Sequence, residues 1–115
     1  MIRCSPMKLR DLNRANNSEQ KIFAYIRSQC EREPLIIRAI LFGSRARGDF
    51  QERSDFDIAI EAPSLSHDAW ARLALRLREE IPTLCGLDLV RINTEISKDL
   101  LAKIKQEGLD LYVRK

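Results

Sequence analysis

The chain has 115 residues, of which 44% are hydrophobic and 32% are charged, and its net charge is +3. This length suits a single domain with one core, and the composition is typical of an ordinary globular protein. The mild positive charge does not predict direct binding to nucleic acid, which calls for a denser basic patch. No apolar stretch reaches the roughly 20 residues that cross a bilayer, and the N-terminus lacks the apolar block of a secretory signal. We therefore expect a cytoplasmic protein that does not enter a membrane.

The cysteines and the histidine argue against a zinc site. Cys4, Cys30 and Cys85 are scattered and show no Cys-x-x-Cys spacing, and His67 is the only histidine. We expect reduced thiols, with Cys30 and Cys85 as small core residues.

The chain begins with a basic segment over residues 1–16, for which two interpretations stay open: a loosely ordered tail or a binding arm. A helix is expected over 18–32, with Asn17 as its N-cap and Pro34 beyond its end. The remaining pattern predicts alternating strands and helices in the following order: a buried strand over 36–42, a polar, turn-rich loop over 43–54, a strand over 57–61, a helix over 67–80, a strand over 87–92, a helix around 96–104 closed by Gly108, and a short strand over 111–113.

Three carboxylates are expected to meet at one edge of the sheet. Asp55 and Asp57 stand two residues apart at the start of a strand, so both project from one face. The polar loop favours antiparallel pairing of the strands 36–42 and 57–61. The helix between 57–61 and 87–92 predicts a parallel pair with a right-handed crossover. The two strand starts then lie together, and Asp88 falls beside Asp57.

These carboxylates would face the turn GSRARGD (Gly43 to Asp49), which is small, basic and suited to phosphate oxygens. Like charges this close repel one another unless cations neutralise them. Mg²⁺ binds a few carboxylates together with substrate phosphates, and two ions about 4 Å apart activate an incoming oxygen and stabilise a leaving one. A third carboxylate could take the proton of an attacking hydroxyl. The pattern therefore indicates metal-assisted chemistry on a nucleotide.

Simpler interpretations exist for several of these residues. Asp88 could be a surface residue of an edge strand, and Arg45 and Arg47 are either phosphate contacts or plain surface charges. His67 fits an exposed position in the first turn of its helix.

The stretch GSRARGDFQERSDFDIAIE (Gly43 to Glu61) resembles the signature of a minimal nucleotidyltransferase of the polymerase-beta-like superfamily. That signature is Gly-Ser, ten residues, Asp-x-Asp, and then a third carboxylate on a later strand. Asp88 matches the third carboxylate by position and context. The ending EGLDLYV (Glu107 to Val113) is also similar to the C-terminus of the family. The resemblance implies an α/β (α+β) fold over residues 17–115, with a mixed sheet of three or four strands flanked by helices in one domain.

The resemblance also implies an activity and the residues that perform it. Gly43 and Ser44 would bind a triphosphate with Arg45 and Arg47 beside them, while Asp55 and Asp57 would hold two Mg²⁺ ions and Asp88 would complete the site or act as base. Proteins of this size resemble the antitoxins of HEPN–MNT pairs, which implies transfer of AMP from ATP to a tyrosine of a HEPN toxin. The alternatives are a non-catalytic module that blocks the toxin by binding it, and a small transferase acting on RNA or a small molecule. A homo-oligomer and a hetero-oligomer are both open.

Overall fold

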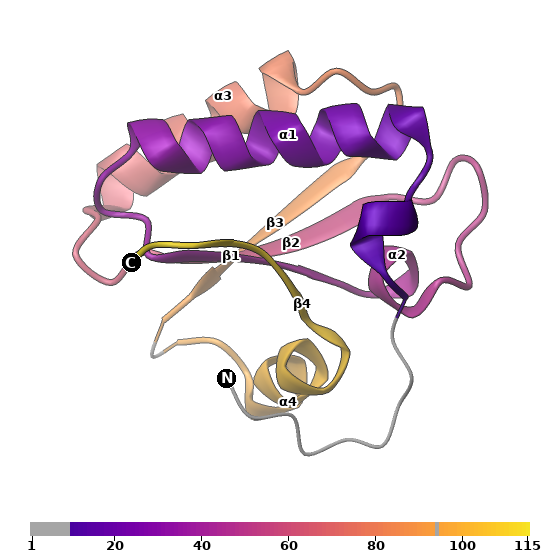
Figure 1. The fold of residues 1–115 in the computed structure, drawn as a ribbon. Helices are drawn as coiled ribbons and strands as arrows, with labels where there is room; N and C mark the ends of the chain where they lie inside the picture. Colours follow the sequence, from indigo (N-terminus) through magenta and orange to yellow (C-terminus); the bar gives the residue numbers. More distant parts are fainter. Residues whose placement is uncertain (1–9, 94) are drawn as a thin grey trace.

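A mixed sheet of four strands organises the computed structural model, which describes residues 10–93 and 95–115 (Figure 1). The strand order is β3-β2-β1-β4. Strand β2 (Phe56–Glu61) pairs antiparallel with β1 (Arg38–Phe42) and parallel with β3 (Leu87–Ile92), which confirms both predicted pairings. Strand β4 (Leu109–Val113) runs antiparallel to β1 at the other edge.

Helices cover both faces of the sheet. Helices α1 (Asn17–Arg32) and α3 (His67–Glu80) lie on one face, and α4 (Lys98–Glu107) lies on the other (Figure 1). A 3₁₀ turn, η1 (Leu12–Arg14), precedes α1, and the short helix α2 (Ser44–Arg47) directly follows β1. None of the described helices has the length and apolar character that crossing a bilayer requires.

The alternation of side chains along β2 divides the core in two. Phe56, Ile58 and Ile60 point towards α1 and α3, where they join the larger buried cluster. Asp57 and Ala59 point the other way, and Ala59 lies in the smaller cluster beneath α4, which also contains Ile40, Phe42 and Ile104. The carboxylate of Asp57 therefore lies on the α4 side of the sheet.

The predicted element bounds are confirmed for α3 and β3 and shift elsewhere. Asn16, rather than Asn17, caps α1, because its side-chain oxygen accepts a hydrogen bond from the Glu19 N–H at 2.9 Å. The polar loop 43–54 contains the unpredicted helix α2. Gly108 does end α4, but in an extended conformation with φ −70°. A glycine is needed there because a Cβ would overlap the Ile104 carbonyl and the Ile40 side chain.

The basic N-terminal segment is described only in part. The residues before Arg10, with Cys4 among them, lie outside the described ranges, and the boundary at residue 16 stays a prediction. From Arg10 onwards the segment packs on the domain. The Arg10 N–H donates to the Ala46 carbonyl at 3.3 Å, and its guanidinium donates to the Arg45 carbonyl at 3.0 Å.

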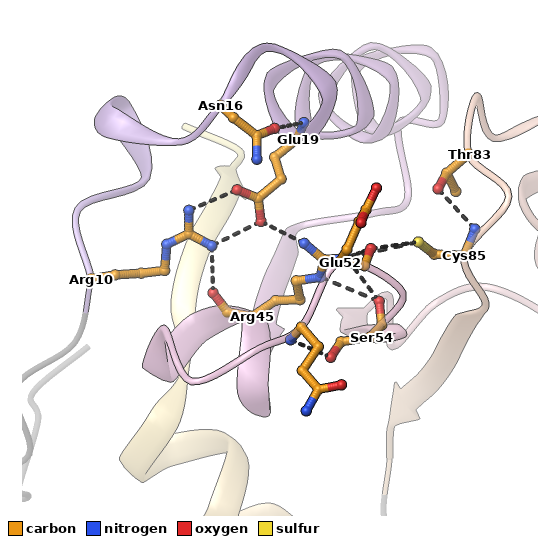
Figure 2. A network of polar contacts seen from close by, with 9 residues as sticks. Arg10, Asn16, Glu19, Arg45, Glu52, Ser54, Thr83 and Cys85 are labelled. Atoms are coloured by element: carbon orange, nitrogen blue, oxygen red, sulfur yellow. Dashed lines mark hydrogen bonds and ion pairs between the residues drawn. The ribbon is translucent and has the colours of Figure 1, made fainter.

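A buried ion pair ties this segment and α1 to the turn after β1 (Figure 2). Glu19 is 2% exposed and Arg45 is 3% exposed, and their closest side-chain atoms are 3.1 Å apart. Arg10 donates to both oxygens of Glu19 at 2.8 Å. Arg45 also donates to the carbonyls of Glu52 and Ser54, which fixes the loop that leads into β2.

The rings of two phenylalanines complete the surroundings of Arg45. Its guanidinium carbon lies 4.3 Å from the centroid of Phe50 and 4.2 Å from that of Phe56. The guanidinium of Arg10 also lies close to Phe50, with its carbon 4.6 Å from the ring centroid. Arg45 therefore makes cation–π contacts with two rings and Arg10 with one, and such contacts are favourable when the cations are desolvated.

We expect Glu19→Gln to lower the free energy of unfolding at neutral pH by about 3 kcal/mol, because it leaves Arg45 buried without its counter-charge. Burial acts to raise the pKa of Glu19, but hydrogen bonds and charges from Arg10 and Arg45 outweigh it and hold that pKa below its ordinary value. The stabilisation is therefore present at neutral pH and is lost as the pH falls below about 4.5.

Urea denaturation at several pH values checks this expectation. Wild type should lose stability more steeply in acid than Glu19→Gln, while Glu79→Gln, at an exposed position of α3, should follow wild type. Parallel acid profiles for wild type and Glu19→Gln would contradict the assignment.

Candidate active site

The strand register places Asp57 and Asp88 side by side. The two residues are partners in the parallel pairing of β2 and β3, as the predicted crossover requires. Asp57 is also the partner of Phe42, the last residue of β1. Gly43 therefore leaves the sheet directly beside the Asp57 carboxylate.

Gly43 is a glycine for two independent reasons. Its backbone has φ +75° and ψ −157°, a conformation that L side chains rarely adopt. A Cβ at this position would also overlap the carboxylate of Asp57. The backbone of the Gly43–Ser44 turn can therefore approach Asp57 more closely than any other residue would allow.

A second glycine, Gly86, holds Asp55. Its N–H donates to Asp55 Oδ1 at 3.1 Å, and a Cβ on Gly86 would overlap the same carboxylate. The Gly86 carbonyl accepts a hydrogen bond from the Phe56 N–H at 2.9 Å, which fixes the start of β2. Sequence reasoning did not identify Gly86, because its position before β3 gives no sign of this contact.

The charges around Asp57 act in opposite directions. Burial raises the pKa of Asp57 above its ordinary value, and the neighbouring charges of Asp88 and Asp55 raise it further. The cations of Lys103 and Arg47 act to lower it, but they do not outweigh burial and repulsion. Lys103, an exposed residue of α4, was not predicted, because its helix showed only an apolar pattern in sequence.

These carboxylates suit a divalent cation. Asp57 is half-buried beside Asp88, and burial together with the charges of Asp88 and Asp55 raises its pKa, so additional positive charge here would favour its ionised form. A bound divalent ion would supply that charge through the oxygen ligands that Mg²⁺ prefers. Within residues 10–93 and 95–115, no three carboxylate, histidine or cysteine side chains already form a group that could hold a metal. The assignment of Asp55, Asp57 and Asp88 to two Mg²⁺ ions remains a prediction.

Arg47 lies at the end of the turn and takes part in two ion pairs. Its Nε is 3.1 Å from Asp49 Oδ2, and its Nη1 is 2.8 Å from Glu107 Oε1. The hydrogen bond to Asp49, followed by that to Glu107, raises the pKa of Arg47 against the effect of burial. Ser44, partly buried, opens α2 directly after Gly43.

Arg45, the other predicted phosphate contact, is not brought to this site. Its guanidinium stacks on Phe56, which points to the α1 side of the sheet, whereas Asp57 points to the α4 side. Its charge is already paired with Glu19. The structure therefore gives Arg45 a role in holding the loop before β2, and we do not retain it among the nucleotide-binding candidates.

A glycine-serine turn facing paired carboxylates on a mixed sheet is the arrangement of a nucleotidyltransferase fold. The family model described as polymerase beta, nucleotidyltransferase matches residues 24–115. The chain belongs to this family.

Solved structures with the same fold include toxin–antitoxin assemblies. The chain is 28% identical to a structure described as a toxin–antitoxin with AMP-PNP, with a TM-score of 0.61 over 87% of this chain and 76% of that one. It is 25% identical to a chain of the toxin–antitoxin MntA–HepT, with a TM-score of 0.61 over 83% and 73% of the two chains. A putative nucleotidyltransferase from Sulfolobus solfataricus, 17% identical with a TM-score of 0.55 over 90% and 94%, shows the fold alone. No curated protein matches the sequence.

We expect Asp57→Asn to stabilise the metal-free protein at neutral pH. Because the pKa of Asp57 is raised in the folded state, the ionised carboxylate disfavours folding as the pH rises through the window above its ordinary pKa. The variant should melt a few degrees higher, which corresponds to about 0.5–1 kcal/mol for a domain of this size. Thermal melts with and without Mg²⁺ check this, since added Mg²⁺ should stabilise wild type more than the variant. A lower melting temperature for metal-free Asp57→Asn would count against it.

We expect Gly43→Ala to destabilise the fold by about 2 kcal/mol or more, through backbone strain and overlap with Asp57. In an Asp57→Ala background only the strain remains, so the same substitution should cost less. A double-mutant cycle by urea denaturation measures the difference. Equal costs in both backgrounds would show that the Asp57 carboxylate does not limit the space at Gly43.

Proposed function

We propose that this chain is a cytoplasmic, Mg²⁺-dependent nucleotidyltransferase that transfers AMP from ATP to a tyrosine of a partner HEPN toxin and thereby acts as its antitoxin. The observation that carries the proposal is the close approach of the Gly43 backbone to the Asp57 carboxylate, with Asp88 beside it. The toxin–antitoxin structures at 25% and 28% identity, one of them with AMP-PNP, support the choice of nucleotide and of partner.

Each residue of the site then has a chemical role. Asp55 and Asp57 would hold the metal, which supplies positive charge to the phosphates and to the attacking oxygen. The Gly43–Ser44 turn would receive the triphosphate, and Arg47 would add a cation at its rim. The tyrosine oxygen attacks the α-phosphorus, the bond to the β-phosphate breaks, and pyrophosphate leaves. Asp88 would complete the metal site or accept the tyrosine proton.

An open hollow beside Asp55 offers a path for the acceptor. It has a volume of about 450 Å³ and is lined by Glu52, Arg53, Asp55, Leu84, Cys85 and Gly86. Leu84 is fully exposed at its margin, where it could contact an apolar side chain of the partner. The hollow thus supports entry of a side chain presented by another protein.

Incubation with Mg²⁺, a HEPN toxin as the candidate partner, and ATP labelled at the α-phosphate tests the proposal. The label should appear on a tyrosine of the HEPN protein, and ATP labelled at the γ-phosphate should leave none. Asp57→Asn should reduce transfer by at least about 100-fold, because it removes a metal-binding carboxylate. Asp110→Asn, at an exposed position of β4, should leave transfer unchanged.

Other outcomes separate the alternatives. Neutralisation of the toxin by an Asp55→Asn, Asp57→Asn double variant would indicate inhibition by binding alone. Label on RNA or a small molecule in place of the HEPN protein would indicate a different acceptor. Undiminished transfer by Asp57→Asn would refute the assignment of the site.

A further inference from the structure

Glu107 is an unusual residue for its place in the fold. It is the last residue of α4, where the helix dipole disfavours a negative charge, and only 8% of it is exposed. A buried carboxylate at a helix C-terminus lowers stability unless specific partners compensate for it. The partners of Glu107 both belong to the turn after β1.

One carboxylate holds the two ends of this turn. Glu107 Oε2 accepts a hydrogen bond from the buried N–H of Gly43 at 3.2 Å. Glu107 Oε1 accepts one from Arg47 Nη1 at 2.8 Å. Gly43 begins the turn against Asp57, and Arg47 ends it, so α4 is connected to both through a single side chain.

We propose that Glu107 is a positioning residue for nucleotide binding: it fixes the Gly43 backbone against the metal-binding carboxylates and directs the Arg47 guanidinium towards the triphosphate. The inference rests on the proposed function, because it concerns the nucleotide of that same site. Glu107 acts through Gly43 and Arg47 and does not itself touch the reacting atoms.

The second ion pair of Arg47 does not replace this contact. The Asp49 side chain is 63% exposed, whereas that of Glu107 is 10% exposed. An exposed pair in water holds a side chain weakly, and a hydrogen bond to a shielded carboxylate holds it more firmly. Asp49 also makes no contact with Gly43 among the hydrogen bonds of the described residues, so the glycine backbone depends on Glu107.

Steady-state kinetics of Glu107→Gln and Glu107→Ala test the inference. Glutamine keeps one acceptor oxygen and the side-chain length but lacks the charge, so we expect the KM for ATP to rise about tenfold with kcat changed less than threefold. Alanine removes both contacts and should raise KM further. Glu79→Gln, an exposed carboxylate on α3, serves as the matched control with unchanged constants. A lower melting temperature of Glu107→Gln with an unchanged or lower KM would overturn the proposal.

Two readouts do not depend on catalysis. In ¹H–¹⁵N spectra, Glu107→Gln should shift the Gly43 amide, and an unmoved signal would overturn the contact. Calorimetric titration with MgATP separates the two proposals. If wild type binds MgATP without transferring AMP, the proposed function fails, and the dissociation constant of Glu107→Gln decides the present inference. If wild type neither binds nor transfers, both fail.

Discussion

The site depends on one electrostatic constraint: two carboxylates, Asp57 and Asp88, stand side by side where parallel strands begin, and one of them is half-buried. Burial and like charge both work against ionisation of Asp57. Gly43, which has no Cβ, leaves space for the carboxylate of Asp57. The positive charges of Lys103 and Arg47 act to lower its pKa, but they do not outweigh burial and repulsion. Under the proposed function, a bound cation would supply the missing positive charge at this edge of the sheet.

The turn between β1 and β2 shows how neighbouring arginines acquire different roles. Arg45 and Arg47 are two residues apart and look equivalent in sequence, yet α2 sends them to opposite sides of the sheet. Arg45 enters the core and pairs with Glu19, and Arg47 remains partly exposed beside Glu107. The first holds the loop before β2 and the second lies at the rim of the site. A single helical turn thus separates a buried arginine that holds the loop from a partly exposed arginine beside the candidate site.

The parts of this arrangement that follow from local pattern were predictable. Alternation of apolar residues predicted β2 and β3, and the intervening helix predicted their parallel pairing, which brings Asp88 to Asp57. The parts that depend on contacts distant in sequence were not. The sequence of the polar loop gave no sign of helix α2. Arg45 is buried because Glu19, on α1, neutralises its charge. Gly86 and Glu107 meet their hydrogen-bond partners only through tertiary packing. Asn16 replaced Asn17 as the cap because adjacent asparagines give sequence reasoning no way to choose between them.

The cation–π contacts of Phe50 with Arg10 and Arg45, and of Arg45 with Phe56, link separate parts of the chain. They connect Arg10, which precedes α1, to the loop that leads into Asp55 and Asp57. A displacement of Arg10 would therefore be transmitted to this loop. A binding partner or fused tag that displaced Arg10 would remove these contacts. It would loosen the loop without contacting Asp55 or Asp57. The segment before α1, for which the sequence left a loose tail or a binding arm open, is therefore mechanically connected to the edge of the sheet that carries the candidate site.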